Sequence, residues 1–309
     1  MTNEQSRNIR TQVVSHPQFI AIQNGLFDAL NITKASGVCK GISILGPSGV
    51  GKSTLIRSFS SQLSGQNESK FLKKVVIAEM PSNPTQKSLA SSILAGMNDP
   101  FAHSRTHSAE EKRTRIVKLI RELKTDVLVI DESQHIAKRL RKEQYETADW
   151  LKSLLNETHI LVILAGLPTL EQFIKSNEQL RRRFSSSYTL DPFSLAEPKS
   201  RLNFLGILQS FQISLGVEAI KLTSPDISMR MYFASCGLID YVVKILEKCA
   251  YIADQENTDI HLGILYRAFN DEVWSSAPPE RNPFAKEFDM RPLTCAGEPF
   301  DGYEWGVSV

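Results

Sequence analysis

Hydrophobic and polar positions divide this chain into two regions that differ in their periodicity. In the first, helical spacing, for example over Ser108–Lys124 and Gln144–Glu157, separates short apolar runs. Strands that alternate with helices predict βαβ crossovers and a parallel sheet with both faces covered. The five runs that we expect to be buried strands are Gly41–Leu45, Val75–Glu79, Val127–Asp131, Ile160–Ala165 and Ser187–Leu190.

After Pro192 the pattern contains only helices, and after Ala277 it loses its periodicity. We therefore expect an N-terminal arm and helix (1–40), an α/β domain (41–192), a small all-helical domain (193–275) and a tail (276–309). Pro, Gly and aromatic residues dominate the tail, which we expect to be extended and ordered only against a partner. The helices expected in the third region are Glu197–Phe211, Ser224–Cys236, Leu238–Asp254 and Asp259–Ser275.

Composition and charge bear on whether the chain could have a nucleic-acid partner. A hydrophobic fraction of 41% with 23% charged residues excludes wholesale disorder. The net charge of +2 argues against a polycation that coats nucleic acid by charge alone. However, residues 270–309 contain eight acids and three bases, so this C-terminal stretch carries −5 and the rest of the chain +7. A basic body with an acidic tail remains compatible with a DNA partner.

Cysteine usage and hydropathy indicate a cytoplasmic protein without a membrane partner. The four cysteines have no metal-ligand spacing, which is typical of free thiols in a reducing compartment. The longest apolar run, Ile160–Leu167, is far shorter than the roughly 20 residues that span a bilayer. The polar N-terminus lacks the apolar core of a signal peptide.

The strongest motif follows the first predicted strand and leads into a helical run over Leu55–Leu63. This is the context that a phosphate-binding P-loop requires. Its glycines let backbone N–H groups point at phosphate oxygens, and the helix N-terminus adds its positive dipole end. Lys52 would reach the β- and γ-phosphates of ATP, and the Ser53 hydroxyl would bind Mg²⁺. The residues of the motif are Gly46, Pro47, Ser48, Gly49, Val50, Gly51, Lys52, Ser53 and Thr54.

A second motif ends the third predicted strand with two acids, Asp131 and Glu132. Asp131 would be the second protein ligand of the metal, and Glu132 would orient and deprotonate an attacking water. Because a P-loop kinase needs only the first acid, Glu132 favours hydrolysis. The strand Val75–Glu79 lies between the two motifs in sequence, which is typical of P-loop ATPases with an inserted central strand. A chance acidic helix cap is the weaker alternative.

Three arginines, Arg181–Arg183, precede Phe184 between the fourth and fifth predicted strands. Taken alone, such a run is more often a solvated helix end. In oligomeric P-loop ATPases, an arginine at this place reaches the γ-phosphate of the neighbouring subunit. We therefore expect Arg183, and after it Arg182, to complete the catalytic site in trans, and activity to depend on assembly.

Basic residues also cluster in the segments that flank the acidic motif. Solvated helix faces carry similar clusters, and Glu110, Glu111 and Glu122 dilute the first one, so both interpretations stay open. In a ring or helix of subunits, phosphate contacts without base reading would add up. The candidate DNA-binding residues are Arg105, Arg113, Arg115, Lys138, Arg139 and Arg141.

Together these motifs resemble the TniB/TnsC-type AAA+ regulators of transposition, from about His16 to Ala250. The more specific segments are Met80–Pro84 and Gln179–Phe184. The chain departs from the pattern at two places. Gly237-Leu238-Ile239-Asp240 has an acid where AAA+ lids often place an arginine, and Gly166-Leu167 stands where the family has Gly-Thr. Both departures predict slow hydrolysis rather than a loss of nucleotide binding.

The resemblance implies an ATPase that uses ATP and Mg²⁺, with a five-stranded parallel sheet and a helical lid. It further implies a homo-oligomer, a hexameric or heptameric ring or a helical filament, on double-stranded DNA. Such proteins link a target-selection protein of the TniQ type to a DDE transposase. The compact length and the tail look most like the versions of CRISPR-associated transposons. In this picture Pro283-Phe284, Pro299-Phe300, Tyr303 and Trp305 dock on a transposase subunit. An ATPase of secretion or envelope machinery and a nucleotide-locked, non-hydrolysing adaptor stay open as alternatives.

Overall fold

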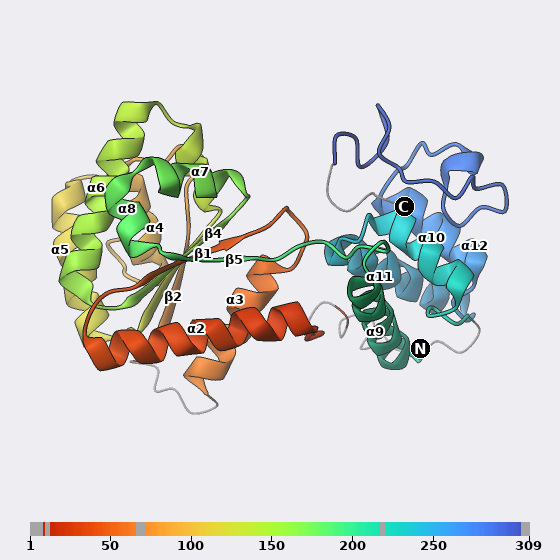
Figure 1. Cartoon of the computed structure of the whole chain (residues 1–309), viewed down its shortest axis with the longest axis horizontal. Coiled ribbons are helices and arrows are strands. Elements are labelled where there is room, and N and C mark those ends of the chain that lie inside the picture. Colours follow the sequence, from red (N-terminus) through yellow and green to blue (C-terminus); the bar gives the residue numbers. More distant parts are fainter. Residues whose placement is uncertain (1–8, 10–12, 66–71, 217–219, 304–309) are drawn as a thin grey trace. The chain divides into compact units, whose positions relative to one another are not determined.

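The computed structural model describes residue 9 and residues 13–65, 72–216 and 220–303 (Figure 1). The chain forms two compact units. An α/β unit contains Gln18–Ser48 and Lys52–Leu190, and a helical unit is formed mainly by Asp191–Val309. The change of sequence pattern at Pro192 lies next to this division. Within the described residues, no helix is long and apolar enough to cross a membrane.

The α/β unit is built on the predicted five-stranded parallel sheet. Its order is β2-β3-β4-β1-β5, so β4 lies between the strands that carry the two motifs. Three strands have the predicted bounds, whereas β4 and β5 each begin and end one residue away from them. The strands are β1 (Gly41–Leu45), β2 (Val75–Glu79), β3 (Val127–Asp131), β4 (Leu161–Gly166) and β5 (Ser186–Thr189).

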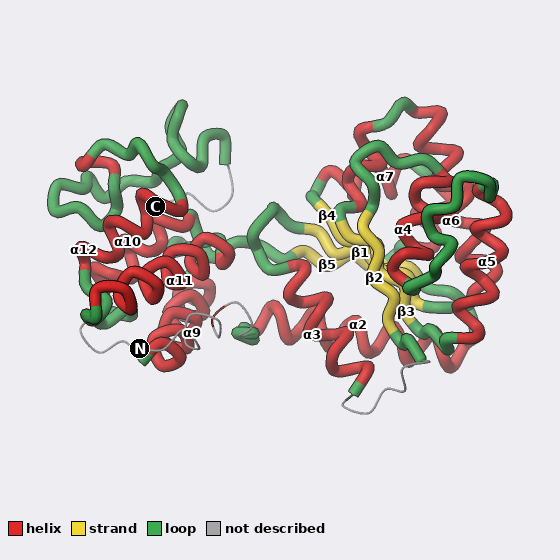
Figure 2. Tube along the Cα trace, turned by 180° about the vertical axis from the view of Figure 1, so that it is seen from behind, coloured by secondary structure: helices red, strands yellow, loops and turns green. Residues whose placement is uncertain are grey.

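Helices cover both faces of this sheet, as Figures 1 and 2 show. Side chains alternate along a strand, so Leu128 and Ile130 of β3 join the core beneath α4, α5 and α6. On the other face, α2 and α3 meet through the rings of Phe27 and Phe59, 4.8 Å apart. Burial on both faces explains why the three central strands, β1, β3 and β4, are mostly apolar along their whole length. The helices are α2 (Pro17–Ser36), α3 (Lys52–Ser64), α4 (Gln86–Gly96), α5 (Ala109–Glu122), α6 (Arg141–Thr158), α7 (Thr169–Ser176) and α8 (Glu178–Arg183), with a 3-10 helix η1 (Ser133–Lys138).

Helix α2 belongs to the α/β unit, although the sequence placed it in a separate N-terminal region. It passes so close to β5 that a Cβ on Gly25 would lie 2.2 Å from the Tyr188 hydroxyl. Gln18 also donates a hydrogen bond of 2.9 Å to the carbonyl of Thr189. The apolar face of α2 is therefore part of the core over the sheet.

The helical unit contains the four predicted helices, each with somewhat different ends. Their buried faces meet through large side chains such as Phe204, Phe211, Leu246 and Phe269, all at most 1% exposed. The helices are α9 (Pro198–Leu215), α10 (Pro225–Ser235), α11 (Ile239–Glu256) and α12 (Leu262–Glu272).

The segment after α12 is folded against these helices, and the expectation of an extended tail is wrong for its described part. Phe284, Phe288 and Phe300 are buried and contact Phe269, Phe233 and Tyr241, respectively. These aromatic residues fill separate gaps between helices, so they need no periodic spacing. A short 3-10 helix η2 (Pro279–Arg281) begins the segment.

Charge pairing further fixes this segment. The guanidinium of Arg281 is buried and forms ion pairs with Asp289 and with Glu298, the latter at 2.7 Å. Some of the acids that make the tail negative therefore neutralise a buried arginine. Phe284 and Phe300 are already covered within the chain, while Trp305, the last of the proposed anchors, lies outside the described residues.

Candidate functional site

The two motifs lie at the same edge of the sheet. β1 ends at Leu45 and β3 ends at Asp131, and both strands pair with β4. Since parallel strands end at one edge, the loop after β1 and the acids at the end of β3 face the same space. This edge is where ligands bind in open α/β sheets.

The P-loop has the backbone conformation that its glycines predict. Gly49 and Gly51 have φ angles of 83° and 101°, a region that other residues rarely adopt. The loop leads directly into α3, which begins at Lys52. The N-terminus of α3 therefore presents free N–H groups at the end of the loop, where a phosphate would accept them.

Lys52 is held inside this loop. Its ammonium donates to the carbonyls of Gly46 and Pro47, both at 2.8 Å, and only 7% of the residue is exposed. Burial lowers the pKa of Lys52, and the carboxylates of Asp131 and Glu132 act in the opposite direction. A buried cation that is satisfied only by loop carbonyls can exchange them for phosphate oxygens at low cost.

Ser53 and Asp131 are in direct contact. The Ser53 hydroxyl donates to the Asp131 carboxylate at 2.9 Å. A hydroxyl and a carboxylate that already face each other supply the oxygen ligands that Mg²⁺ prefers, together with phosphate oxygens of a nucleotide. Among the described residues, no group of three or more His, Cys, Asp or Glu side chains could hold a metal ion. A Mg²⁺ ion at Ser53 and Asp131 would therefore need phosphate oxygens as further ligands.

Glu132 has an unusual backbone conformation. Its φ of 54° and ψ of 28° are left-handed, which costs energy in a residue that is not glycine. Its N–H donates to the Asp131 carboxylate at 2.8 Å. The two successive carboxylates have different partners, Ser53 for Asp131 and Gln134 for Glu132.

A residue that the sequence did not single out, Gln134, holds Glu132. The buried Gln134 amide donates to the Glu132 carboxylate and accepts from the Leu167 N–H at 3.0 Å. Gly166 makes room for it, because a Cβ there would lie 2.5 Å from the Gln134 side-chain oxygen. The neighbouring Gly166 carbonyl accepts from the Gly46 N–H at 3.2 Å.

Gln134 therefore connects the proposed base with the end of β4 and the start of the P-loop. This is the strand end at which the sequence found no polar residue to sense the γ-phosphate. Sequence spacing carried no signal for Gln134, since its role depends on how closely η1 packs against β4.

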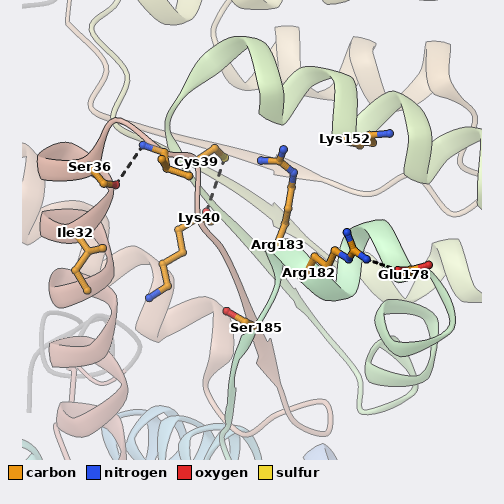
Figure 3. Close-up of a pocket in the computed structure, with 10 residues that line it drawn as sticks. Ile32, Ser36, Cys39, Lys40, Lys152, Glu178, Arg182, Arg183 and Ser185 are labelled. Carbon is orange, nitrogen blue, oxygen red and sulfur yellow. Dashed lines mark hydrogen bonds and ion pairs between the residues drawn. The ribbon is translucent and has the colours of Figure 1, made fainter.

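Arg182 and Arg183 lie at the opposite edge of the sheet. They end α8, just before β5, and line a cavity of about 670 Å³ together with Lys40, which precedes β1. In Figure 3, Arg182 lies along Glu178, whereas Arg183 extends toward α6. The Arg183 guanidinium donates a hydrogen bond to the side-chain oxygen of Asn156 in that helix. Because β1 has five residues, the cavity and the P-loop are separated by roughly 16 Å of strand.

The arginines are thus too far from the P-loop of their own chain to act on its nucleotide. The sequence-predicted site therefore divides into two groups within the α/β unit. Lys52, Ser53, Asp131 and Glu132 come together at one edge, while Arg182 and Arg183 lie at the other.

Comparison with known families decides which class of ATPase this is. Residues 7–194 match the family model described as Bacterial TniB protein. The chain belongs to the TniB family. It is a transposition-associated AAA+ ATPase, which confirms the resemblance inferred from the motifs. No curated protein matches the chain.

Solved structures share the fold of this TniB-family ATPase at low identity. The Aeropyrum pernix ORC2 protein in its ADPNP–ADP complexes has 13% identity and a TM-score of 0.61, covering 86% of this chain and 69% of that chain. The Aeropyrum pernix ORC1 protein in complex with DNA has 17% identity and a TM-score of 0.63, with coverages of 87% and 67%. Cdc6p from Pyrobaculum aerophilum has 16% identity and a TM-score of 0.61, with coverages of 87% and 71%.

The six candidate DNA-binding residues of the TniB-family ATPase divide into two sets. Three of them are engaged within the chain: Arg113 with Glu110 and Glu157, Arg115 with Asp99, and Arg139 with Asn83 and Glu143. Arg105, Lys138 and Arg141 are exposed, and no described carboxylate pairs with them. Only this second set keeps its charge free for a phosphate.

Asp240, the acid that departs from the AAA+ lid pattern, also has a partner in the helical unit. Asp240, in the first turn of α11, forms an ion pair with Lys244 at 2.7 Å. From the sequence alone, we recognised only that position 240 has an acid where AAA+ lids often have an arginine. One helical turn later, the TniB-family chain carries a cation on the same face of α11.

Proposed function

We propose that this TniB-family ATPase is an assembly-dependent switch that binds double-stranded DNA and recruits a DDE transposase. One observation carries the proposal: the P-loop and Arg182–Arg183 lie at opposite ends of β1. A site that needs both must be built from two chains. Head-to-tail contacts of this kind generate rings or helical filaments.

The chemistry follows from the residues at each edge. ATP would lie with its phosphates against the P-loop and Lys52, and Mg²⁺ bound by Ser53 and Asp131 would neutralise charge on the phosphates. Glu132 would take a proton from a water molecule while the oxygen of that water forms a bond to the γ-phosphorus. The bond from that phosphorus to the bridging oxygen of ADP would break, and Arg183 of the next chain would stabilise the developing charge.

DNA contact would use the exposed cations Arg105, Lys138 and Arg141. Electrostatic contacts to phosphates give affinity without sequence preference, and the sequence predicts binding of this kind, directed at the DNA backbone and not at base edges. A protein of the TniQ type would select the target, and the ATP-bound assembly would present it to the transposase. Hydrolysis would then dismantle the assembly.

The decisive experiment is electron microscopy of the protein with duplex DNA and a non-hydrolysable ATP analogue. We expect rings or filaments with the analogue and none with ADP. An unassembled wild-type protein under these conditions would overturn the proposal. Addition of the transposase and the TniQ-type protein would show whether the assembly, and not the free chain, recruits them.

The DNA contacts can be tested with matched arginine variants. Replacing Arg105, Lys138 or Arg141 by Ala should weaken binding and lower the slope of log affinity against log salt by about one per lost phosphate contact. The control is Arg113→Ala, which removes an intramolecular ion pair and should leave that slope unchanged. Equal slopes for both sets would argue against this DNA-binding face.

A nucleotide-locked adaptor is the second candidate. Neither Gly166 nor Leu167, at the end of β4, has a polar side chain of its own that could contact a γ-phosphate, which favours slow turnover. ATP turnover measured with saturating DNA and transposase separates the two functions. An adaptor would show no turnover above that of Glu132→Gln.

A further inference from the structure

The cavity at the amino-terminal edge of the sheet carries more positive charge than the two arginines. Lys40, Lys152, Arg182 and Arg183 line it, and Glu178 is its one acidic lining residue (Figure 3). Glu178 pairs with Arg182 at 2.6 Å. No described acidic side chain pairs with Lys40 or Lys152. The cavity therefore has a net charge of +3 and two lysines whose charges are free.

The arginine side of this cavity is held in place by packing. Phe184 is buried against β1 so tightly that a Cβ on Gly41 would lie 2.6 Å from its ring. Arg183, which directly precedes Phe184, donates a hydrogen bond to the side chain of Asn156 in α6. Burial raises the pKa of the adjacent Cys39 thiol to about 11, while the charge of Arg183 acts in the opposite direction. The thiol thus stays neutral beside this cation.

An anion is the ligand that such a cavity would bind. A volume of about 670 Å³ is typical of sites for compact molecules. Cations that line one cavity suit a group of closely spaced phosphates, whereas a duplex presents its phosphates along an extended surface. The chemistry therefore favours a polyphosphate over DNA.

That polyphosphate cannot be the one on the P-loop of the same chain, which is roughly 16 Å away along β1. We propose that the cavity receives the triphosphate of ATP bound to a second copy of this chain, and that Lys40 and Lys152 act on it together with Arg183. This proposal rests on the proposed function, in which Arg183 acts in trans, and adds two residues to that site. The lysines would neutralise phosphate charge that Lys52 of the other copy does not reach.

The test is a subunit-mixing experiment with ATP turnover on DNA as its readout. One variant, Glu132→Gln, keeps its cavity but cannot hydrolyse its own ATP. The other, Lys40→Met with Lys152→Met, keeps the P-loop and Glu132 and loses both charges while retaining the apolar stems. We expect the double variant alone to be slower than wild type by about tenfold or more. A mixture should exceed the sum of its parts, because the double variant's ATP then faces an intact cavity.

Two further samples give the experiment its controls. Lys175→Ala removes an exposed lysine on α7 and should be unchanged, and Lys40→Arg with Lys152→Arg should restore most of the rate. If the Met variant alone keeps wild-type turnover, or if mixing gives no gain, the role of the lysines is overturned. If it instead loses DNA binding in the absence of nucleotide, the cavity is a DNA site and the proposal is also wrong.

A parallel mixture of Glu132→Gln with Arg183→Ala separates this inference from the proposed function. If turnover recovers in the arginine mixture but the lysine substitutions have no effect, the proposal that Arg183 acts in trans stands. Only the proposed role of Lys40 and Lys152 is then overturned. A failure of the arginine mixture, with both proteins folded and assembled, would overturn the trans arrangement itself.

Discussion

The two ends of β1 differ in the way they can hold phosphate. At the carboxyl end, backbone N–H groups, a buried lysine and two carboxylates provide donors, a metal site and a base. At the amino end, four cations and a single acid, Glu178, line a cavity. The first end can bind nucleotide and position water, and the second can only stabilise negative charge. In the proposed function, this difference means that each chain carries two incomplete halves of a site, so that assembly controls the chemistry.

Removal of the P-loop cation should have the largest effect on this comparison. Lys52→Ala deletes the ammonium that now bridges the Gly46 and Pro47 carbonyls. The proposed function assigns to this ammonium the contact with the β- and γ-phosphates. We expect ATP affinity to fall by roughly 100-fold or more and assembly on DNA to be lost. Fluorescent-nucleotide titration and electron microscopy measure the two effects.

The matched control for this variant is Lys175→Ala, which removes an exposed lysine of α7 that pairs only with Glu171. It should retain both nucleotide affinity and assembly. Assembly by Lys52→Ala at wild-type levels would contradict the proposal that Lys52 binds the nucleotide on which assembly depends.

Gln134→Met should have the next largest effect. It removes both hydrogen bonds that tie Glu132 to the end of β4 and keeps the length of the side chain. We expect kcat to fall about tenfold with little change in KM, because the base loses its orientation while the P-loop is untouched. Steady-state kinetics with DNA measures both constants.

A double-mutant comparison tests whether Gln134 acts through Glu132. In the Glu132→Gln background, Gln134→Met should cause little further loss, since the group that it positions is already gone. Gln172→Met, on the exposed surface of α7, serves as the control. An equal loss in both backgrounds would show that Gln134 acts in some other way.

Much of the fold and half of the site could be predicted because the signals are local. Five apolar runs and a Gly-rich loop before a helix gave the sheet and the position of Lys52. The pairing of Ser53 with Asp131 followed from the parallel order of the strands. Such patterns depend on residues that are close in sequence or on one rule of topology.

The other features depend on packing between distant segments. The contacts of Gln134 depend on the room that Gly166 leaves for it, and the proposed role of Lys40 depends on β1 beginning beside the end of α8. The tail was taken as extended because irregularly spaced aromatics give no periodic signal, yet Phe284 and Phe300 are buried between helices. The same holds for Arg113, whose charge is neutralised by Glu157 from another helix.

Gly41→Ala probes the support of the cavity end. The added methyl group would overlap the Phe184 ring, so the ring and the adjacent Arg183 must shift. We expect a loss of about 1–3 kcal/mol in stability and a several-fold slower turnover with unchanged nucleotide affinity. Thermal unfolding and kinetics measure these, and Gly206→Ala, in α9 with no atom near the added methyl, is the control.

Asn156→Ala should have the smallest effect on turnover, and it compares the two ends of β1 most directly. It removes the side chain that accepts from Arg183 and leaves the arginine and its backbone in place. Asn156 is exposed, so the lost hydrogen bond contributes little to stability, and Arg183 only gains freedom. We expect turnover to fall about two- to threefold with KM and assembly unchanged. A glutamine at this position should recover part of the rate, because its longer amide can still reach the guanidinium. If Asn156→Ala instead weakened nucleotide binding in the isolated chain, the two ends of β1 would not be separable, since a change at the amino end would then reach the P-loop of the same subunit.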